Sequence, residues 1–206
     1  MLFRSRLHQT DRGLHIAKMS SASPGANRRP DAKIRRAALA DAAHISRVHW
    51  QSWQESYSGI LPSSYLNSFS EEDRRKFWKK FLAAPKPHTF VLVAEVHAQP
   101  KIVGFLAGGP LREIASPQEA EIYAIYMLGA YRRRRIGTLL LSNAMSIFQA
   151  GGIQRVGAWV LENNSGAVAF YKHFGGMFVG EKTEIVKKFQ LKQRYYLLHQ
   201  PGQHAD

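Results

Sequence analysis

The sequence of 206 residues contains no cysteine. This absence excludes a disulfide framework, a thiolate zinc site and a cysteine nucleophile. Long apolar runs are also missing, since none approaches the roughly 18 residues that a membrane-spanning helix needs. Acidic residues are scarce: 15 Asp and Glu stand against 29 Lys and Arg, which gives a formal net charge of +14. Such a surplus favours a phosphate-rich partner, whether nucleic acid, an anionic membrane or a nucleotide cofactor.

The basic surplus is dense at the amino terminus. Residues 1–30 carry six basic side chains against one acidic side chain, and residues 20–27 have the Ser-, Gly- and Pro-containing composition of a linker. We therefore expect a disordered basic extension over 1–30 and one domain over 31–206. The extension lacks the unbroken apolar core of a secretory signal, so we expect a cytoplasmic protein. An organelle address and a natural start at Met19 are the alternatives.

Apolar periodicity and turn residues predict a mixed α/β domain. The predicted helices cover residues 41–57, 62–66, 70–82, 137–149 and 166–174. The predicted strands cover residues 33–36, 89–95, 101–107, 121–128, 155–161, 177–180 and 192–198. Ser70 and Asp73 form a capping-box pattern at one helix start. The run Gly108-Gly109-Pro110 is expected to break the strand before it.

A basic turn joins an apolar strand to an amphipathic helix in the middle of the chain. The strand covers 121–128, four arginines follow at 132–135, and the helix begins near Gly137. Backbone N–H groups converge at such a helix amino terminus, and its dipole and the guanidinium groups favour a bound phosphate. A solvated basic turn and a nucleic-acid signal are the competing interpretations. The second fits less well, because the arginines lie between two apolar elements.

A second pattern follows the next predicted strand. Asn164, Ala167 and Phe170 recur at a spacing of three, Tyr171 follows directly, and Gly175 ends the helix. Taken alone, a neighbouring Phe and Tyr are typical of a packed core.

Together the two stretches resemble the GNAT family of N-acetyltransferases, which move an acetyl group from acetyl-CoA to a primary amine. In that family a strand leads into Arg/Gln-x-x-Gly-x-Gly/Ala, whose amides bind the CoA pyrophosphate, and an Asn-to-Tyr signature follows. The resemblance covers about residues 33–198. It implies an α/β fold with a mixed, mostly antiparallel central sheet flanked by helices, of the acyl-CoA N-acyltransferase type. It also implies acetyl-CoA as the acetyl donor.

The resemblance assigns roles to individual residues. Tyr171 matches the general acid for the leaving thiolate, and Glu121 lies where one branch carries its base; a packed tyrosine and an ordinary strand carboxylate are the alternatives. The N–H of Met127, beside an expected strand bulge, is the expected contact of the acetyl carbonyl. The residues expected around the cofactor are Ile125, Tyr126, Met127, Arg132, Arg133, Arg134, Arg135, Ile136, Gly137, Thr138, Asn164, Ala167 and Phe170.

Two positions depart from the family pattern. Arg135 stands where the family has its first motif glycine, so only the second glycine, Gly137, is present. Because glycine lets the backbone approach a phosphate closely, we expect weaker or rearranged cofactor binding. Trp159 stands where the branch that acetylates ribosomal proteins carries its base, which argues against that mechanism.

Aromatic residues are the candidates for the amine pocket: Trp50, Trp53, Tyr57 and Tyr123. Aromatic stripes at helical spacing more often pack in a core, and His49 is a candidate proton relay with the same alternative. The expected acceptor is a primary amine of a small molecule or a protein, and the positive charge disfavours a polycation. We expect no metal, no membrane or nucleic-acid partner, and a monomer or homodimer.

The function that these patterns favour is acetyl-CoA-dependent N-acetyl transfer by direct attack of the amine. A catalytically degenerate CoA-binding fold-mate is one alternative. A basic nucleic-acid-associated protein, whose arginines contact phosphates, is the other; it would show steeply salt-dependent binding.

Overall fold

A computed structural model describes residues 32–98, 100–112, 119–186 and 189–198. The basic extension expected over 1–30 lies outside these ranges. The strands are β1 (Lys33–Arg36), β2 (Phe90–Glu95), β3 (Ile102–Pro110), β4 (Glu119–Met127), β5 (Arg155–Leu161), β6 (Met177–Val186) and β7 (Phe189–Leu198). The helices are η1 (Leu39–Asp41), α1 (Ala42–Tyr57), α2 (Ser63–Leu66), α3 (Glu71–Ala83), η2 (Gly129–Tyr131), α4 (Ile136–Ala150) and α5 (Ser165–His173).

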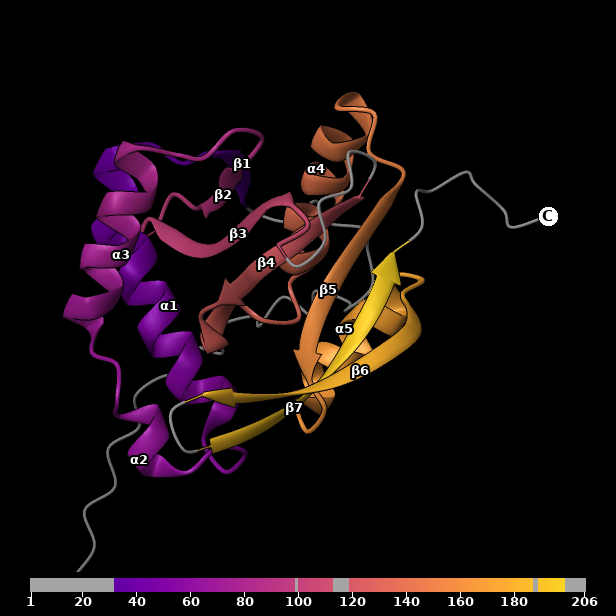
Figure 1. Cartoon of the computed structure of the whole chain (residues 1–206). Coiled ribbons are helices and arrows are strands. Elements are labelled where there is room, and N and C mark those ends of the chain that lie inside the picture. The colour runs from indigo at the N-terminus through magenta and orange to yellow at the C-terminus, as the bar shows by residue number, and fades with distance from the viewer. Residues whose placement is uncertain (1–31, 99, 113–118, 187–188, 199–206) are drawn as a thin grey trace, which may run out of the picture.

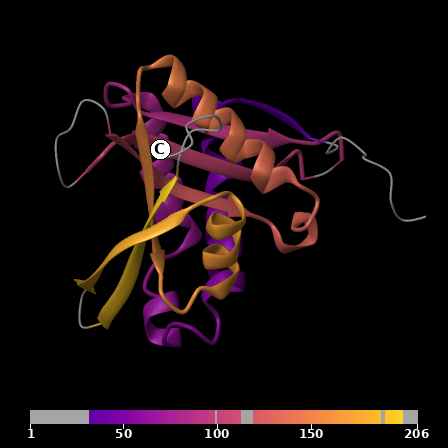
Figure 2. The same cartoon turned by 90° about the vertical axis from the view of Figure 1, so that its right-hand side faces the viewer.

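The strands form one sheet in the order β1-β2-β3-β4-β5-β7-β6. Within the described residues β4 and β5 are parallel, and the other neighbouring strands are antiparallel. Helices α1 and α3 cover one face of the sheet, and α4 and α5 cover the other (Figures 1 and 2). The predicted mixed, mostly antiparallel α/β fold is therefore confirmed.

The core lies where helices cover both faces of the central strands. Strands β2 and β3 are buried along almost their whole length, so they are apolar runs without alternation. Helix α1 contributes Ile45 and Val48, and α4 contributes Leu140, Leu141 and Phe148. The predicted capping box at the start of α3 is present, since the Asp73 N–H donates to Ser70 Oγ at 3.1 Å.

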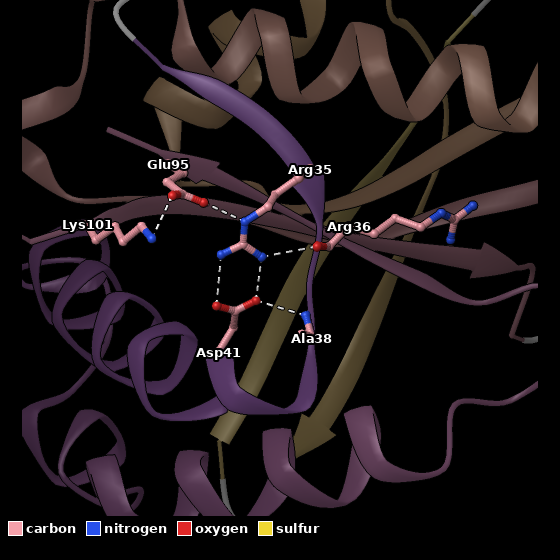
Figure 3. A network of polar contacts seen from close by, with 6 residues as sticks. All are labelled: Arg35, Arg36, Ala38, Asp41, Glu95 and Lys101. Carbon is pink, nitrogen blue, oxygen red and sulfur yellow. Dashed lines mark hydrogen bonds and ion pairs between the residues drawn. The ribbon is translucent and has the colours of Figure 1, made fainter. Parts of the chain in front are cut away.

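A polar network ties the amino-terminal strand to its neighbours (Figure 3). The Arg35 guanidinium donates to both Asp41 oxygens, at 2.6 and 3.0 Å, and to Glu95 at 2.5 Å. Asp41 also accepts the Ala38 N–H at 2.8 Å, and Lys101 pairs with Glu95 at 2.9 Å. The arginine holds the pKa of Asp41 below its usual range. These contacts fix β1 and the start of α1 against the β2–β3 hairpin.

The expectation that Gly108-Gly109-Pro110 breaks its strand is wrong, because β3 continues through Pro110. Both glycines are required by close neighbours. A Cβ on Gly108 would lie 2.9 Å from the Phe148 ring, and one on Gly109 would lie 2.6 Å from the Tyr123 hydroxyl. The absence of side chains at these positions therefore serves packing, and the backbone stays extended.

The carboxyl-terminal strands are longer than predicted. The sequence predicts strands over 177–180 and 192–198, whereas β6 and β7 pair up to Val186 and Phe189, with a register shift between Phe178 and Gly180. Strand β6 is an edge strand whose side chains are mostly exposed, including Ile185 at 69%. It lacks the apolar alternation that marks a half-buried strand, and this is why the sequence pattern ends too early.

Candidate active site

A cleft opens where two neighbouring strands separate. Strands β4 and β5 pair at three positions, the last of which joins Glu121 to Gly157. Both strands continue beyond this point, and a cleft of about 640 Å³ lies between them, bordered by the end of α1 and the starts of α4 and α5. Backbone groups on the inner strand edges have no ladder partner there, so they are available to a ligand.

Most of the predicted binding residues come together in this cleft. Those that line it are Tyr57, Tyr123, Ile125, Tyr126, Met127, Arg132, Arg133, Gly137, Asn164, Ala167, Phe170 and Tyr171. Those that lie outside the lining are Trp50, Trp53, Glu121, Arg134, Arg135, Ile136 and Thr138. Lining residues that the sequence analysis did not propose are Glu55, Ser56, Ile60, Ile122, Ala124, Trp159, Val160, Ser165 and Gly166.

Strand β4 presents Met127 to the cleft. The N–H of Leu128 donates to the Val103 carbonyl of β3 at 3.0 Å. Successive N–H groups of a strand point to opposite edges, so the N–H of Met127 points away from β3, toward β5 and the cleft. The bulge in β4 falls earlier than expected: Ala107 pairs with Ala124 and the next residue of β3 pairs with Ile122, so Tyr123 is the extra residue.

The basic loop before α4 has an unusual backbone. Arg133 and Arg135 have φ of 62° and 60°, the left-handed region that favours glycine. Arg135 is the N-cap of α4 and stands at the position of the missing motif glycine. A glycine would adopt this φ without strain. A non-glycine residue there costs about 1–2 kcal/mol. The loop nevertheless places Arg133 and Gly137 in the cleft lining.

Arg132 is held by helix α1. Its guanidinium lies 3.2 Å from a Glu55 oxygen and 3.1 Å from Ser56 Oγ, and the same Glu55 oxygen accepts the Gly129 N–H at 2.8 Å. These contacts join the loop before α4 to the end of α1. Glu55 and Ser56 carried no signal in the sequence, because their role depends on how α1 packs against a loop more than 70 residues away.

Gly137 allows two helices and a strand to approach closely. A Cβ at this position would lie 3.3 Å from the Phe170 ring and 3.4 Å from the Met127 methyl carbon. On α5, Asn164 is the N-cap, and its side-chain oxygen accepts the Ala167 N–H at 3.1 Å. The two motifs thus position the starts of α4 and α5 on one side of the cleft.

Tyr171 is 4% exposed and lines the cleft. Burial, with smaller contributions from Tyr57 and Glu121, raises the pKa of its phenol well above the usual value. The phenol is therefore protonated at neutral pH and can donate a proton to a developing anion.

Glu121 lies at the point where the two strands separate, and its side chain is 1% exposed. Arg112 occupies both carboxylate oxygens: its Nε lies 3.1 Å from each, its Nη2 contacts Oε1, and its backbone N–H contacts Oε2 at 3.4 Å. The Arg112 guanidinium also lies 4.9 Å from the Tyr123 ring centroid. Arg112 therefore holds the Glu121 carboxylate in place through both of its oxygens.

The predicted aromatic pocket residues occupy two layers. Tyr57 and Tyr123 line the cleft, whereas Trp53 packs behind Tyr57 with ring centroids 4.5 Å apart, and Trp50 is half-buried outside the lining. The Tyr123 hydroxyl donates to the Pro110 carbonyl at 2.6 Å, and burial raises the pKa of this phenol to about 12.

His49 belongs to the core. Its Nδ1 accepts the Trp78 indole N–H at 3.0 Å, and its ring stacks on Tyr126 at 4.7 Å. Burial lowers its pKa to about 3, so the imidazole is neutral at physiological pH. These contacts favour the core interpretation of His49 over a proton relay.

The described residues hold neither a metal site nor a membrane-spanning helix. No group of His, Cys, Asp and Glu side chains there could hold a metal ion. None of the helices within 32–98, 100–112, 119–186 and 189–198 is long and apolar enough to span a bilayer.

Comparison with known proteins agrees with this geometry. The model of the Acetyltransferase (GNAT) family matches residues 50–176. "Uncharacterized N-acetyltransferase YuaI" of Bacillus subtilis is 29% identical over 160 residues, covering 78% of this chain and 88% of that protein. Spermidine N(1)-acetyltransferase of Thermoplasma acidophilum is 26% identical over 141 residues, covering 68% and 84%. The structure of PaiA N-acetyltransferase from Thermoplasma acidophilum, in complex with coenzyme A, superposes with a TM-score of 0.58 at 23% identity, covering 79% and 97%.

The fold and the cleft define an acyl-CoA-type transferase, and the family match extends over both motifs that border the cleft. The chain belongs to the Acetyltransferase (GNAT) family. It is an N-acetyltransferase that takes the acetyl group of acetyl-CoA and transfers it to an amine.

Proposed function

We propose that the cleft between β4 and β5 binds acetyl-CoA and that its residues carry out the transfer. The observation that supports this most strongly is the separation of the two strands directly beside the amino terminus of α4. The loop of four arginines and the α4 N–H groups suit a pyrophosphate, and the inner edge of β4 suits an extended amide-bearing arm. The groups present therefore fit CoA.

The residues around the cofactor keep their predicted roles in this proposal. Arg132, Arg133, Arg134 and Arg135, with the amides of Ile136, Gly137 and Thr138, would bind the phosphates. Ile125, Tyr126 and Met127 would contact the arm from β4. Asn164, Ala167 and Phe170 would contact it from α5.

The acetyl transfer needs two proton movements. The amine nitrogen attacks the thioester carbon, the C–N bond forms, and the C–S bond breaks. The N–H of Met127 would stabilise the carbonyl oxygen, and the Tyr171 hydroxyl would protonate the departing thiolate. Glu121 would accept the amine proton through a water, since its carboxylate lies outside the cleft lining. Proton exchange with solvent then restores both groups.

The acceptor side of the cleft is aromatic. Tyr57 and Tyr123 line it, with Trp159 on the opposite strand, and Trp53 and Trp50 lie behind. We propose a primary amine of a small molecule or a protein as the acceptor, in the cytoplasm. Spermidine, the substrate in the name of the relative from Thermoplasma acidophilum, belongs in the first panel of acceptors.

The test is amine-dependent thiol release from acetyl-CoA by the wild-type protein and by Tyr171→Phe. Loss of the general acid is expected to lower kcat by about 10²–10⁴-fold. Tyr196→Phe is the matched control, because it removes an equally buried hydroxyl outside the cleft lining. Equal rates for wild type and Tyr171→Phe would refute the assigned role.

A further inference from the structure

A half-buried arginine lies beside the acceptor side of the cleft. The guanidinium carbon of Arg74, on α3, lies 5.1 Å from the ring centroid of Trp53 and 4.9 Å from that of Phe69. We call these three residues the Arg74 sandwich. The Arg74 Nε is buried and makes no hydrogen bond, and the same holds for the indole nitrogen of Trp53. Both atoms are donors that lack an acceptor, and the rest of the guanidinium belongs to a half-buried residue that carries a positive charge.

Carboxylates near the Arg74 sandwich are engaged elsewhere. Asp73 accepts the backbone N–H of Ser70 at 2.9 Å and its hydroxyl at 2.7 Å, so it caps α3. Glu184 accepts from the Gln193 amide at 2.9 Å. Across the part of the chain that the structure describes, no carboxylate forms an ion pair with Arg74. A partly desolvated cation without a counter-ion is costly, and burial lowers the pKa of Arg74.

The Arg74 sandwich is one aromatic layer away from the cleft. Tyr57 lines the cleft, and its ring centroid lies 4.5 Å from that of Trp53, which in turn contacts Arg74. The Tyr57 ring and the guanidinium carbon are thus within about 10 Å of each other, a span of two aromatic contacts. Arg74 also acts electrostatically on Tyr126, another lining residue. The distance between the cleft and the Arg74 guanidinium is therefore within the length of an acceptor of moderate size.

The cleft itself offers little unpaired negative charge to a cationic acceptor. Glu55 is a lining carboxylate, and it is paired with Arg132 at 3.2 Å. Glu121 is held by Arg112. Recognition of a polyamine requires free carboxylates along the acceptor path, whereas recognition of an anion requires an unpaired guanidinium.

We propose that Arg74 binds an anionic group, a carboxylate or a phosphate, carried by the acceptor amine. The acceptor would be an amino acid, a short peptide or an aminoalkyl phosphate, and a polyamine would be excluded. This inference deepens the proposed function and rests on it, because the amine of the same molecule must reach the acetyl group in the cleft. Trp53 and Phe69 contact the guanidinium by cation–π interactions, which restrict its position.

The experiment compares linear ω-amino acids with three to seven methylene groups with their primary amides, with aminoalkyl phosphates of the same lengths and with spermidine. Two quantities are measured for each compound: kcat/KM for acetyl transfer, and calorimetric binding to the protein saturated with CoA. At least one carboxylate or phosphate is expected to exceed its amide at least tenfold, and spermidine is expected to be poorer than the acids. The carboxylate and phosphate arms decide which anion is preferred.

Arg74→Gln is expected to abolish this preference, and Arg75→Gln is the matched control. Arg75 is the next residue on α3, is exposed, and pairs with Glu72 on its own helix. Arg74→Lys keeps the charge and should retain part of the preference. A preference that survives in Arg74→Gln would overturn the proposal. So would equal binding of acids and amides by the wild type, which needs no variant to fold.

The failure of this inference is distinguishable from that of the proposed function. If acetyl-CoA binds in the cleft and amines are acetylated without regard to their anionic group, the Arg74 proposal alone is wrong. If acetyl-CoA does not bind in the cleft, the proposed function fails first.

Discussion

The two sides of the cleft are built in different ways. The donor side uses β4, α4, β5 and α5, which follow one another along residues 119–173. The acceptor side uses the end of α1, where Tyr57 lines the cleft and packs on Trp53, which in turn contacts Arg74 of α3. One side thus depends on backbone turns encoded locally, and the other depends on side chains that only tertiary packing brings together.

This difference predicts different responses to substitution. On the donor side, N–H groups and glycine positions matter most, so changes there act through backbone geometry. On the acceptor side, charge and aromatic packing matter most, so changes there act through single side chains. Two carboxylates lie at the border between the sides, and an arginine holds each of them. Glu55 of α1 pairs with Arg132 of the loop before α4, and Glu121 of β4 pairs with Arg112, which precedes that strand.

The largest effect is expected at the border between the two sides. Glu121→Gln should lower kcat/KM by about 10²-fold or more at neutral pH, because the amine proton loses its acceptor. Arg112→Gln should lower kcat/KM less than Glu121→Gln does, because it keeps the carboxylate and removes only its cationic partner. Acetyl transfer by both variants at neutral pH measures this. Full activity in Glu121→Gln would remove Glu121 from the mechanism.

The next largest effect is expected at His49 of α1, whose burial should make the free energy of unfolding of the protein fall in acid. Its folded pKa of about 3 lies below the unfolded value of 6.5, so its contribution is present above pH 6.5 and is lost as the pH falls toward 3. Between pH 7 and pH 4 the loss is on the order of 3 kcal/mol. Urea unfolding at both pH values measures it. In His49→Gln the same comparison should show a smaller loss, and an equal loss would contradict the account.

A smaller effect is expected on the donor side at Arg135. Arg135→Gly should raise the free energy of unfolding by up to about 1 kcal/mol, because it relieves a left-handed backbone at the N-cap of α4. Arg134→Gly is the control, since Arg134 lacks positive φ and stacks on Tyr131 at 5.1 Å. Thermal unfolding of both variants decides the matter. Destabilisation by Arg135→Gly equal to that of Arg134→Gly would contradict the strain argument.

The sequence predicts the donor side of the cleft better than the acceptor side. The α4 loop and the Asn164-to-Tyr171 pattern are local, and the structure brings their residues together in the cleft apart from some members of the arginine loop. Arg74 and Glu55 gave no signal, because their importance arises from contacts between segments distant in the chain. The predicted strand over 177–180 is shorter than β6, because this exposed strand has little apolar periodicity. Gly108 and Gly109 misled the prediction because their neighbours, Phe148 and Tyr123, come from other elements.

The most direct test of the account is calorimetric titration of the wild-type protein and of Gly137→Leu with acetyl-CoA. The leucine would fill the space between Met127 and Phe170, at the entrance to the α4 amino terminus. We expect one-site binding by the wild type at micromolar strength, about −8 kcal/mol, and at least tenfold weaker binding by a folded Gly137→Leu. Equal affinity of the two proteins would show that acetyl-CoA does not bind between β4 and β5.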